Sequence, residues 1–206
     1  MKLTWYGHAC FRLESPDGTV VFDPYEPGSV TGLRLPELRA DAAIYSHGHS
    51  DHYSPESVTL SGVKPAMKLR QMATWHDGKR GELRGSNIVS AVTTEGMTLV
   101  HLGDLGHELS EKQLEELGKV TVLLIPVGGY YTIDAAQAKR TADAVGPKII
   151  VPMHYREGHR GIQNISGVDR FLEMFKPEQI HMLPSDSMEI DTGTPGGVYV
   201  FPWPKG

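Results

Sequence analysis

The sequence predicts an α/β protein in which two β-sheets pack against each other with helices on the outside. In the first half, short segments of alternating apolar and polar residues are separated by tight turns, which is typical of antiparallel strands. In the second half, helical patterns alternate with short apolar runs, which is typical of a sheet covered by helices. Because the sequence has no internal repeat and no flexible linker, we expect residues 1–206 to form a single domain.

The first half is expected to contain strands only. The opening strands are residues 2–6, 9–14 and 19–22. The last two are joined by the turn Ser15-Pro16-Asp17-Gly18. A further strand at 42–46 ends abruptly in a polar, histidine-rich segment, which we interpret as a loop. A second antiparallel group is expected between 64 and 100, with its clearest strands at 89–92 and 97–102.

The second half is expected to contain three helices and four strands. The helices are 110–117, 134–145 and 166–175, and the strands are 120–126, 148–153, 179–183 and 198–201. Ser110 and Gln113 have the spacing of a capping box, in which each residue satisfies a free N–H group of the other at the start of a helix. Gly118 and Gly146 stand where glycine commonly ends a helix.

Composition excludes several classes of protein. The net charge of -5 and the pI near 6.0 provide no basic field for nucleic acid or an anionic membrane, so neither partner is expected. The longest apolar run, 120–127, is far shorter than the roughly 20 residues of a membrane helix. Cys10 is the single cysteine, which excludes an intramolecular disulfide and a cysteine-based zinc cluster. We expect a cytoplasmic protein in which Cys10 is buried, and a homo-oligomer is left open.

The pattern His47-x-His49-x-Asp51-His52 follows the strand at 42–46 and predicts a metal site. At the end of an extended segment, residues two apart point the same way, so His47 and His49 can converge on one ion. The alternative is a polar surface loop. Further candidate ligands stand where other strands are expected to end, at His76-Asp77, at Gly103-Asp104 and at His154. Loops at one edge of a sandwich can bring such distant residues together.

Eight short motifs make the sequence similar to the metallo-β-lactamase-fold hydrolases, and within them to the small prokaryotic group of ascorbate-phosphate lactonase-like proteins. The motifs are GHACF (7–11), FDPY (22–25), SHGHSDH (46–52), WHD (75–77), RGSN (84–87), HLGDLG (101–106), PVGGYYTID (126–134) and PMHY (152–155). The resemblance implies an αββα sandwich with a dinuclear metal site at the edge where the sheets meet. It implies that His47, His49 and His76 hold a first ion, that Asp51, His52 and His154 hold a second, and that Asp104 bridges them.

Two divalent ions would lower the pKa of a shared water and polarise a carbonyl or phosphoryl oxygen, so that water is the nucleophile. Asp51 is the expected proton acceptor. Zinc is the first expectation for the ions, with manganese and iron as alternatives. The formal positive charge of the site favours a small anionic substrate.

Several other residues are candidates for a role beside the metals. His101 is a rival to His76 as the third ligand of the first ion. His8 is either a structural histidine or a residue beside the metal or the substrate. Asp23 is either a plain turn residue or the partner that orients a ligand histidine. Arg84, Asn87 and Tyr130 are candidates for contact with the substrate, because RGSN and GGYYT offer groups that bind anions. The alternatives are a plain surface turn at RGSN and a tight strand-to-helix loop at GGYYT.

Three functions are compatible with these residues. The first is a metal-dependent hydrolase of a small anionic ester, lactone or phosphoester. The second is a nuclease or phosphodiesterase of the same fold, which the net charge disfavours because it needs a basic groove. The third is a non-catalytic metal-binding or redox-sensing domain, which the complete set of hydrolytic ligands disfavours.

Overall fold

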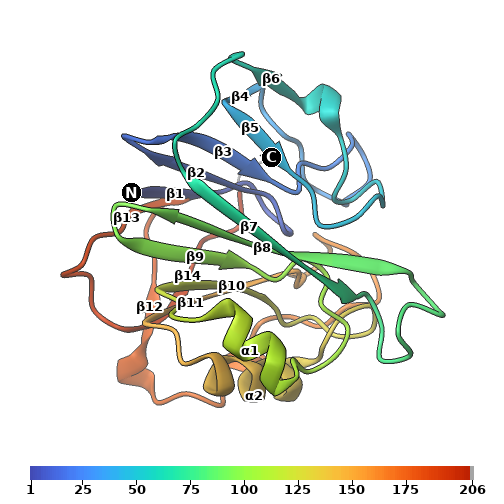
Figure 1. Ribbon diagram of the computed structural model, residues 1–206. Coiled ribbons are helices and arrows are strands. Elements are labelled where there is room, and N and C mark those ends of the chain that lie inside the picture. Colours follow the sequence, from blue (N-terminus) through green and yellow to red (C-terminus); the bar gives the residue numbers. More distant parts are fainter. Residues whose placement is uncertain (205–206) are drawn as a thin grey trace.

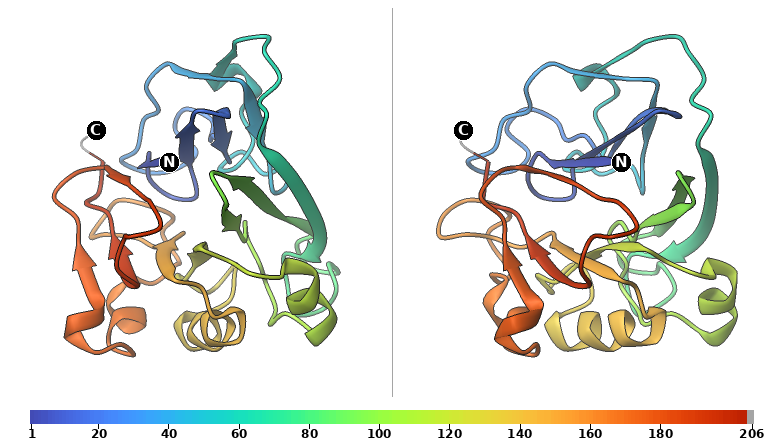
Figure 2. Two further views of the ribbon diagram at one scale, coloured as in Figure 1. Left: turned by 60° about the vertical axis from the view of Figure 1, so that its left-hand side comes forward. Right: turned by 90° about the vertical axis from the view of Figure 1, so that its left-hand side faces the viewer.

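The computed structural model describes residues 1–204 and confirms the predicted architecture of two large sheets with few helices. Figure 1 shows the five-stranded sheet above the seven-stranded sheet, with α1 and α2 beneath the latter. A two-stranded sheet formed by β4 (Leu38–Ala40) and β6 (Val58–Leu60) lies beyond the five-stranded sheet, with the short 3-10 helix η1 (Pro55–Ser57). Figure 2 shows from two further sides that all the helical turns of the second half lie on one side of the molecule.

The five-stranded sheet has the order β13-β1-β2-β3-β5. Its members are β1 (Lys2–Trp5), β2 (Phe11–Ser15), β3 (Gly18–Phe22), β5 (Ala42–Ile44) and β13 (Ser187–Glu189). The predicted hairpin between β2 and β3 is confirmed, and the last pair of its ladder joins Ser15 to Gly18. Only β5 runs parallel to its neighbour, β3, so the chain must leave the sheet after β3 and return through the 23–41 segment.

The seven-stranded sheet has the order β12-β14-β11-β10-β9-β8-β7. Its members are β7 (Lys68–Trp75), β8 (Ser86–Thr94), β9 (Met97–His101), β10 (Val122–Pro126), β11 (Ile149–Met153), β12 (Ile180–Met182) and β14 (Gly197–Val200). β7, β8 and β9 pair antiparallel, as expected, and the remaining strands pair parallel. Every residue of β10 is buried, because the other sheet covers one of its faces and helices cover the other.

Two of the three expected helices are confirmed almost to the residue. They are α1 (Glu111–Leu117), which starts with the predicted capping box of Ser110 and Gln113, and α2 (Ala135–Val145), which starts with a capping box of Asp134 and Gln137. Gly118 and Gly146 end these helices with positive φ angles of 64° and 61°, which glycine adopts at little cost.

The expected helix at 166–175 is much shorter than predicted. Only α3 (Asp169–Leu172) is α-helical. The backbone of Ser166 is already bonded to other loops, because its N–H donates to Gly128 O (2.7 Å) and its carbonyl accepts from Arg156 N–H (3.1 Å). A second 3-10 helix, η2 (Pro177–Gln179), begins at the proline that ends this region. The three-residue strands β4, β6 and β13 were not predicted.

The core lies between the two sheets and continues under α1 and α2. Its fully buried large side chains include Leu3, Phe11, Leu13, Phe22, Leu99 and Leu123. Aromatic side chains pack around Trp5 at one end of the core. The ring centre of Trp5 lies 5.6 Å from that of Tyr155 and 5.6 Å from that of Trp203. Cys10 is completely buried, as expected, and burial raises its thiol pKa well above the usual value. Within residues 1–204 no helix has the length and apolarity that crossing a bilayer requires.

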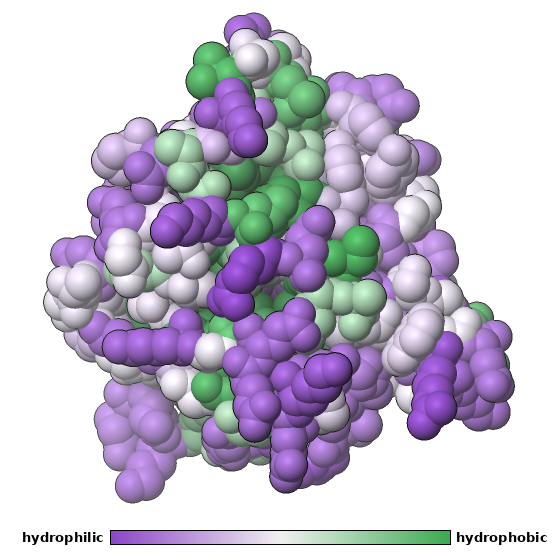
Figure 3. Space-filling model, viewed as in Figure 1, coloured by the Kyte–Doolittle hydropathy of each residue, from purple (hydrophilic) through white to green (hydrophobic). Residues whose placement is uncertain are grey.

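The face shown in Figure 3 is mostly hydrophilic, with hydrophobic atoms gathered in the middle and upper parts of the view. The exposed large apolar side chains are Tyr53, Leu60, Val63, Leu69, Trp75, Leu83, Tyr130, Met174 and Met182. They come from separate loops and strands, and single exposed apolar residues of this kind are normal on a protein surface.

Strand directions determine where the polar loops meet. β9, β10 and β11 are parallel, and β7 is antiparallel to β8, which is antiparallel to β9. β7, β9, β10 and β11 therefore all point the same way, and the loops that follow them leave the sheet at one edge. These loops carry the candidate ligands His76, Asp104 and His154.

Candidate metal centre

Asp104 lies at the centre of a group of four histidines that come from three different loops. His52 Nε2 is 3.2 Å from its Oδ1, whereas His76 Nε2 and His154 Nε2 are 3.1 Å and 3.2 Å from its Oδ2. His47 Nε2 is 3.9 Å from Oδ2. The Asp104 side chain is only 2% exposed, so these imidazoles replace water around it.

The structure brings all seven sequence-predicted ligands together. Their donor atoms form three groups, each lying within 4.8 Å: His47, His49 and His76; His47, His52 and Asp104; and His8, Asp51, His52 and His154. The first group corresponds to the expected first site. The last contains the three residues expected at the second site and, in addition, His8.

Buried atoms without partners show that the residues fit a cation. Within the described chain, Nε2 of His47, Nε2 of His52 and Oδ1 of Asp104 are buried and have no hydrogen-bond partner. Leaving such polar atoms unpaired is costly, whereas a metal ion would use their lone pairs. Neutral imidazoles and carboxylates without thiolate suit zinc, and are compatible with manganese or iron.

The protonation of His47 and His8 matches a ligand role, whereas His52 holds a proton that a metal ion must displace. Burial lowers the pKa of His47 to about 3 and that of His8 to about 4, so both imidazoles are neutral at pH 7. Burial alone would lower the pKa of His52 too, but Asp104 and Asp23 raise it well above its usual value. Burial would raise the pKa of Asp104, but His154 and His52 lower it well below the usual range. A metal ion at this centre would therefore compete with a proton on His52.

Asp23 orients His52 directly and His47 through Ser46. It accepts hydrogen bonds from His52 Nδ1 (2.8 Å), Ser46 N (2.7 Å) and Ser46 Oγ (2.6 Å). His47 Nδ1 in turn donates to Ser46 Oγ (2.9 Å). With their Nδ1 atoms bonded in this way, His52 and His47 present Nε2 to the centre, which is the usual arrangement around a metal-binding histidine. Burial opposes ionisation of Asp23, yet His101 and the bonds from His52 and Ser46 hold its pKa below the usual value.

Backbone and amide groups hold the remaining candidates. His76 Nδ1 donates to the carbonyl of Tyr131 (3.2 Å). Asn87 is completely buried, where its Oδ1 accepts from Asp104 N (2.8 Å) and its Nδ2 donates to Leu102 O (2.9 Å). The amide of Asn87 therefore fixes the loop of Asp104 and has no group free for a substrate. A side chain at Gly106 would collide with the backbone of His76 and Asp77, so glycine lets these two loops pack together.

Three non-glycine residues of the centre have left-handed backbone conformations. Their φ angles are 52° for His8, 43° for Asp23 and 51° for His154. Such conformations are uncommon for residues with side chains, and they persist where the surrounding structure enforces them, often at functional sites.

The remaining candidates lie in different surroundings. Both ring nitrogens of His101 are bonded to backbone, Nε2 to Ala9 O (2.9 Å) and Nδ1 to Gly103 N (3.0 Å), so the structure favours His76 over His101 as a ligand. Arg84 lies over the ring of Tyr131, with 5.4 Å from its Cζ to the ring centre. Tyr130 is 64% exposed. Sequence reasoning did not find Ser46 or the carbonyl of Tyr131, because neither role has a residue pattern.

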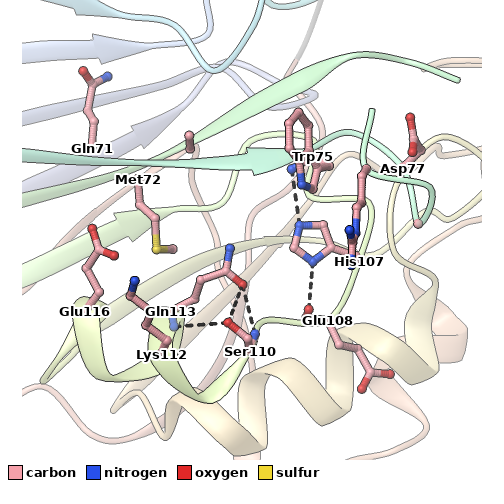
Figure 4. Close-up of a pocket in the computed structure, with 13 residues that line it drawn as sticks. Gln71, Met72, Trp75, Asp77, His107, Glu108, Ser110, Lys112, Gln113 and Glu116 are labelled. Atoms are coloured by element: carbon pink, nitrogen blue, oxygen red, sulfur yellow. Dashed lines mark hydrogen bonds between the residues drawn. The ribbon is translucent and has the colours of Figure 1, made fainter. Parts of the chain in front are cut away.

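Figure 4 shows a separate groove between β7 and α1. It is lined by polar side chains such as Gln71, Lys112, Gln113 and Glu116, and His107 Nε2 accepts a bond from Trp75 N (3.3 Å) at one end. None of the seven expected ligands lines this groove. We therefore do not assign it to the metal centre.

Comparison with known proteins agrees with the fold and the donor set. Residues 2–154 match the family model of the β-lactamase superfamily domain. A solved structure from Thermotoga maritima, assigned to the Zn-dependent hydrolases of the metallo-β-lactamase superfamily, superposes with a TM-score of 0.77 at 34% identity and covers 97% of each chain. The fold and the His/Asp cluster thus define a metal-dependent hydrolase of the metallo-β-lactamase superfamily.

Two curated relatives make the family more specific. The UPF0173 metal-dependent hydrolase of Carboxydothermus hydrogenoformans is 30% identical, and the match covers 75% of this chain and 84% of the relative. The UPF0173 metal-dependent hydrolase of Archaeoglobus fulgidus is 28% identical, and the match covers 86% of this chain and 96% of the relative. The chain belongs to this family, the UPF0173 metal-dependent hydrolases.

Proposed function

We propose that the enzyme uses two divalent metal ions to hydrolyse a small anionic ester, lactone or phosphoester. The central observation is the position of Asp104, whose two carboxylate oxygens face histidines of both candidate sites. His47, His49 and His76 would hold the first ion, Asp51, His52 and His154 the second, and Asp104 would lie between them. When bound, such a pair of ions lowers the pKa of a shared water and polarises the carbonyl or phosphoryl oxygen under attack.

Asp51 is the residue that we assign to proton transfer. Its side chain is 21% exposed, whereas that of Asp104 is almost completely buried, so Asp51 is the carboxylate of the cluster that a substrate and water can reach. His8 and His52 lower the pKa of Asp51 against the effect of burial, which keeps it ionised. Asp51 can then accept a proton from the attacking water and return it to the oxygen of the leaving group.

The charge of the centre supports an anionic substrate. Two divalent ions contribute four positive charges, and Asp51 and Asp104 neutralise two of them. Arg84 adds a further positive charge above Tyr131, whose carbonyl holds His76. A guanidinium in this position can bind a carboxylate or phosphate through two parallel hydrogen bonds.

The test is a panel of lactones, phosphate monoesters and phosphodiesters, assayed with protein reconstituted with zinc, manganese or iron. His49→Ala and Asp104→Ala should each lower kcat/KM at least ~100-fold on any hydrolysed substrate, as expected when binding and positioning of the catalytic ions are lost. His159→Ala is the matched control, because His159 is exposed and belongs to none of the donor groups. Unchanged hydrolysis by Asp104→Ala would show that this centre is not the catalyst.

A further inference from the structure

His8 is built rigidly into the wall of the metal centre. It lies in the loop between β1 and β2, where Gly7 and His8 both have positive φ angles, of 93° and 52°. Its carbonyl accepts bonds from Trp5 Nε1 (3.1 Å) and from the backbone N–H of His154 (3.2 Å). Its side chain is completely buried. The position of this imidazole is therefore set by its backbone, and it is tied directly to a candidate ligand of the second ion.

The spacing of the imidazoles around His8 matches that of the first site. The ring centre of His8 is 5.0 Å from that of His52 and 4.1 Å from that of His154, which are 5.6 Å from each other. At the first site the three ring centres of His47, His49 and His76 are 4.6, 4.7 and 5.2 Å apart. Three imidazoles thus converge on each side of Asp104, whereas the family resemblance assigns only two to the second side.

The donor atom of His8 faces the same point as the carboxylate of Asp51. His8 Nε2 lies 3.2 Å from Asp51 Oδ2, and the donor atoms of His8, Asp51, His52 and His154 all lie within 4.8 Å of one another. Two ligand atoms that are each ~2.1 Å from one zinc ion, at an angle near 100°, would be about 3.2 Å apart. His154 Nε2 likewise lies 3.2 Å from Asp104 Oδ2, so in both residues Nε2 is the atom turned toward the carboxylates of the centre, and Nδ1 of each is buried without a hydrogen-bond partner.

Resting on the dinuclear site proposed above, we propose that His8 is a direct ligand of the second metal ion. That ion would then be held by three imidazoles and Asp51, and would share Asp104 with the first ion. The first ion would have one protein ligand fewer. The two ions would consequently differ, with the second held more tightly and the first having more positions free for water and substrate.

The alternative is a hydrogen bond in which His8 Nε2–H donates to Asp51 and His8 only positions that carboxylate. His8→Gln separates the two possibilities, because a glutamine amide can still donate a hydrogen bond but is a poor ligand for zinc. His8→Ala removes both functions, and His159→Ala is the control. Circular dichroism of each metal-free variant establishes that it is folded before metal is added.

The measurement is a titration of the metal-free proteins with Zn²⁺ against a chelating indicator, repeated with Co²⁺ to record the visible absorption of each equivalent. We expect wild type and His159→Ala to bind two equivalents. In His8→Gln and His8→Ala, affinity for one equivalent should fall by more than the roughly 10- to 100-fold typical of residues that only support a ligand. The Co²⁺ bands of that equivalent should also change.

Two results would overturn the assignment, and they can be told apart. If His8→Gln binds both equivalents with wild-type affinity and an unchanged Co²⁺ spectrum, His8 is not a ligand, while the dinuclear proposal stands. If wild type itself binds a single equivalent, the dinuclear proposal and the assignment of His8 fail together. Because His8→Gln keeps the size and polarity of the side chain, it also provides the test if His8→Ala does not fold.

Discussion

Replacing Asp23 with asparagine should weaken metal binding without removing any metal ligand. Asp23 Oδ2 accepts from both His52 Nδ1 and Ser46 Oγ, and Oδ1 accepts from Ser46 N. An asparagine amide has one oxygen, so at least one of these three buried donors must face an NH₂ group. His52 then loses the charged acceptor that directs its Nε2 to the centre.

The size of the effect follows from these contacts. Loss of one hydrogen bond to a buried charged group costs about 1.5–3 kcal/mol. A mutated outer partner of a ligand histidine typically costs about 10- to 100-fold in metal affinity, which is about 1.4–2.8 kcal/mol. We therefore expect Asp23→Asn to weaken binding of the ion held by His52 about 10- to 100-fold.

The assay is competition with a chelating indicator, on protein whose folding is checked by circular dichroism. Asp41→Asn is the matched control, because Asp41 also accepts bonds from a backbone N–H and a serine hydroxyl, those of Thr19 and Ser61, but belongs to none of the donor groups. Wild-type affinity in folded Asp23→Asn would refute the view that Asp23 orients His52.

Three further predictions concern metal, protons and substrate. Removal of metal by a chelator should lower the Tm, because an ion at 100 times its Kd stabilises the folded protein by about 2.7 kcal/mol. If metal analysis confirms that the ions have been removed and the Tm is unchanged, the proposed metal site is contradicted. Metal uptake near pH 6.5 should release protons into a weakly buffered dye solution, and metal affinity should weaken as the pH falls. The reason is that neighbouring carboxylates raise the pKa values of His52 and His76 against the effect of burial, so a metal ion must displace their protons. Absence of proton release would show that these histidines are already neutral. Arg84→Ala should raise KM for an anionic substrate about 10-fold or more through loss of a charge-assisted contact. Arg39→Ala is the control and should leave KM unchanged, because Arg39 is exposed. Equal effects of the two variants would exclude Arg84 from substrate binding.

Local patterns were sufficient for most of the secondary structure. The alternation of apolar residues between 64 and 100 and the capping box of α1 depend on neighbours in sequence. They predicted β8, β9 and α1, and they predicted the antiparallel group to which β7 belongs without giving bounds for that strand. The helix expected at 166–175 was wrong because the backbone of Ser166 is bonded to residues 128 and 156, and no local pattern reports such contacts.

The candidate site shows the same division between local and distant information. The spacing of His47, His49, Asp51 and His52 indicates metal binding by itself, because these residues are neighbours in the chain. The relation of Asp23 to His52 and Ser46 depends on a parallel pairing of β3 with β5. His8 reaches the centre only because its loop packs on the backbone of His154. Both residues are candidates from the sequence, but neither contact could be assigned from it, because each joins residues that are far apart in the chain.

Element-resolved metal analysis of purified wild type and Asp104→Ala, before and after reconstitution, tests the central claim most directly. We expect about two equivalents of divalent metal in the wild type and a clear loss in Asp104→Ala, because Asp104 faces the histidines of both sites. Wild type without metal after reconstitution, or Asp104→Ala with the full two equivalents, would contradict it.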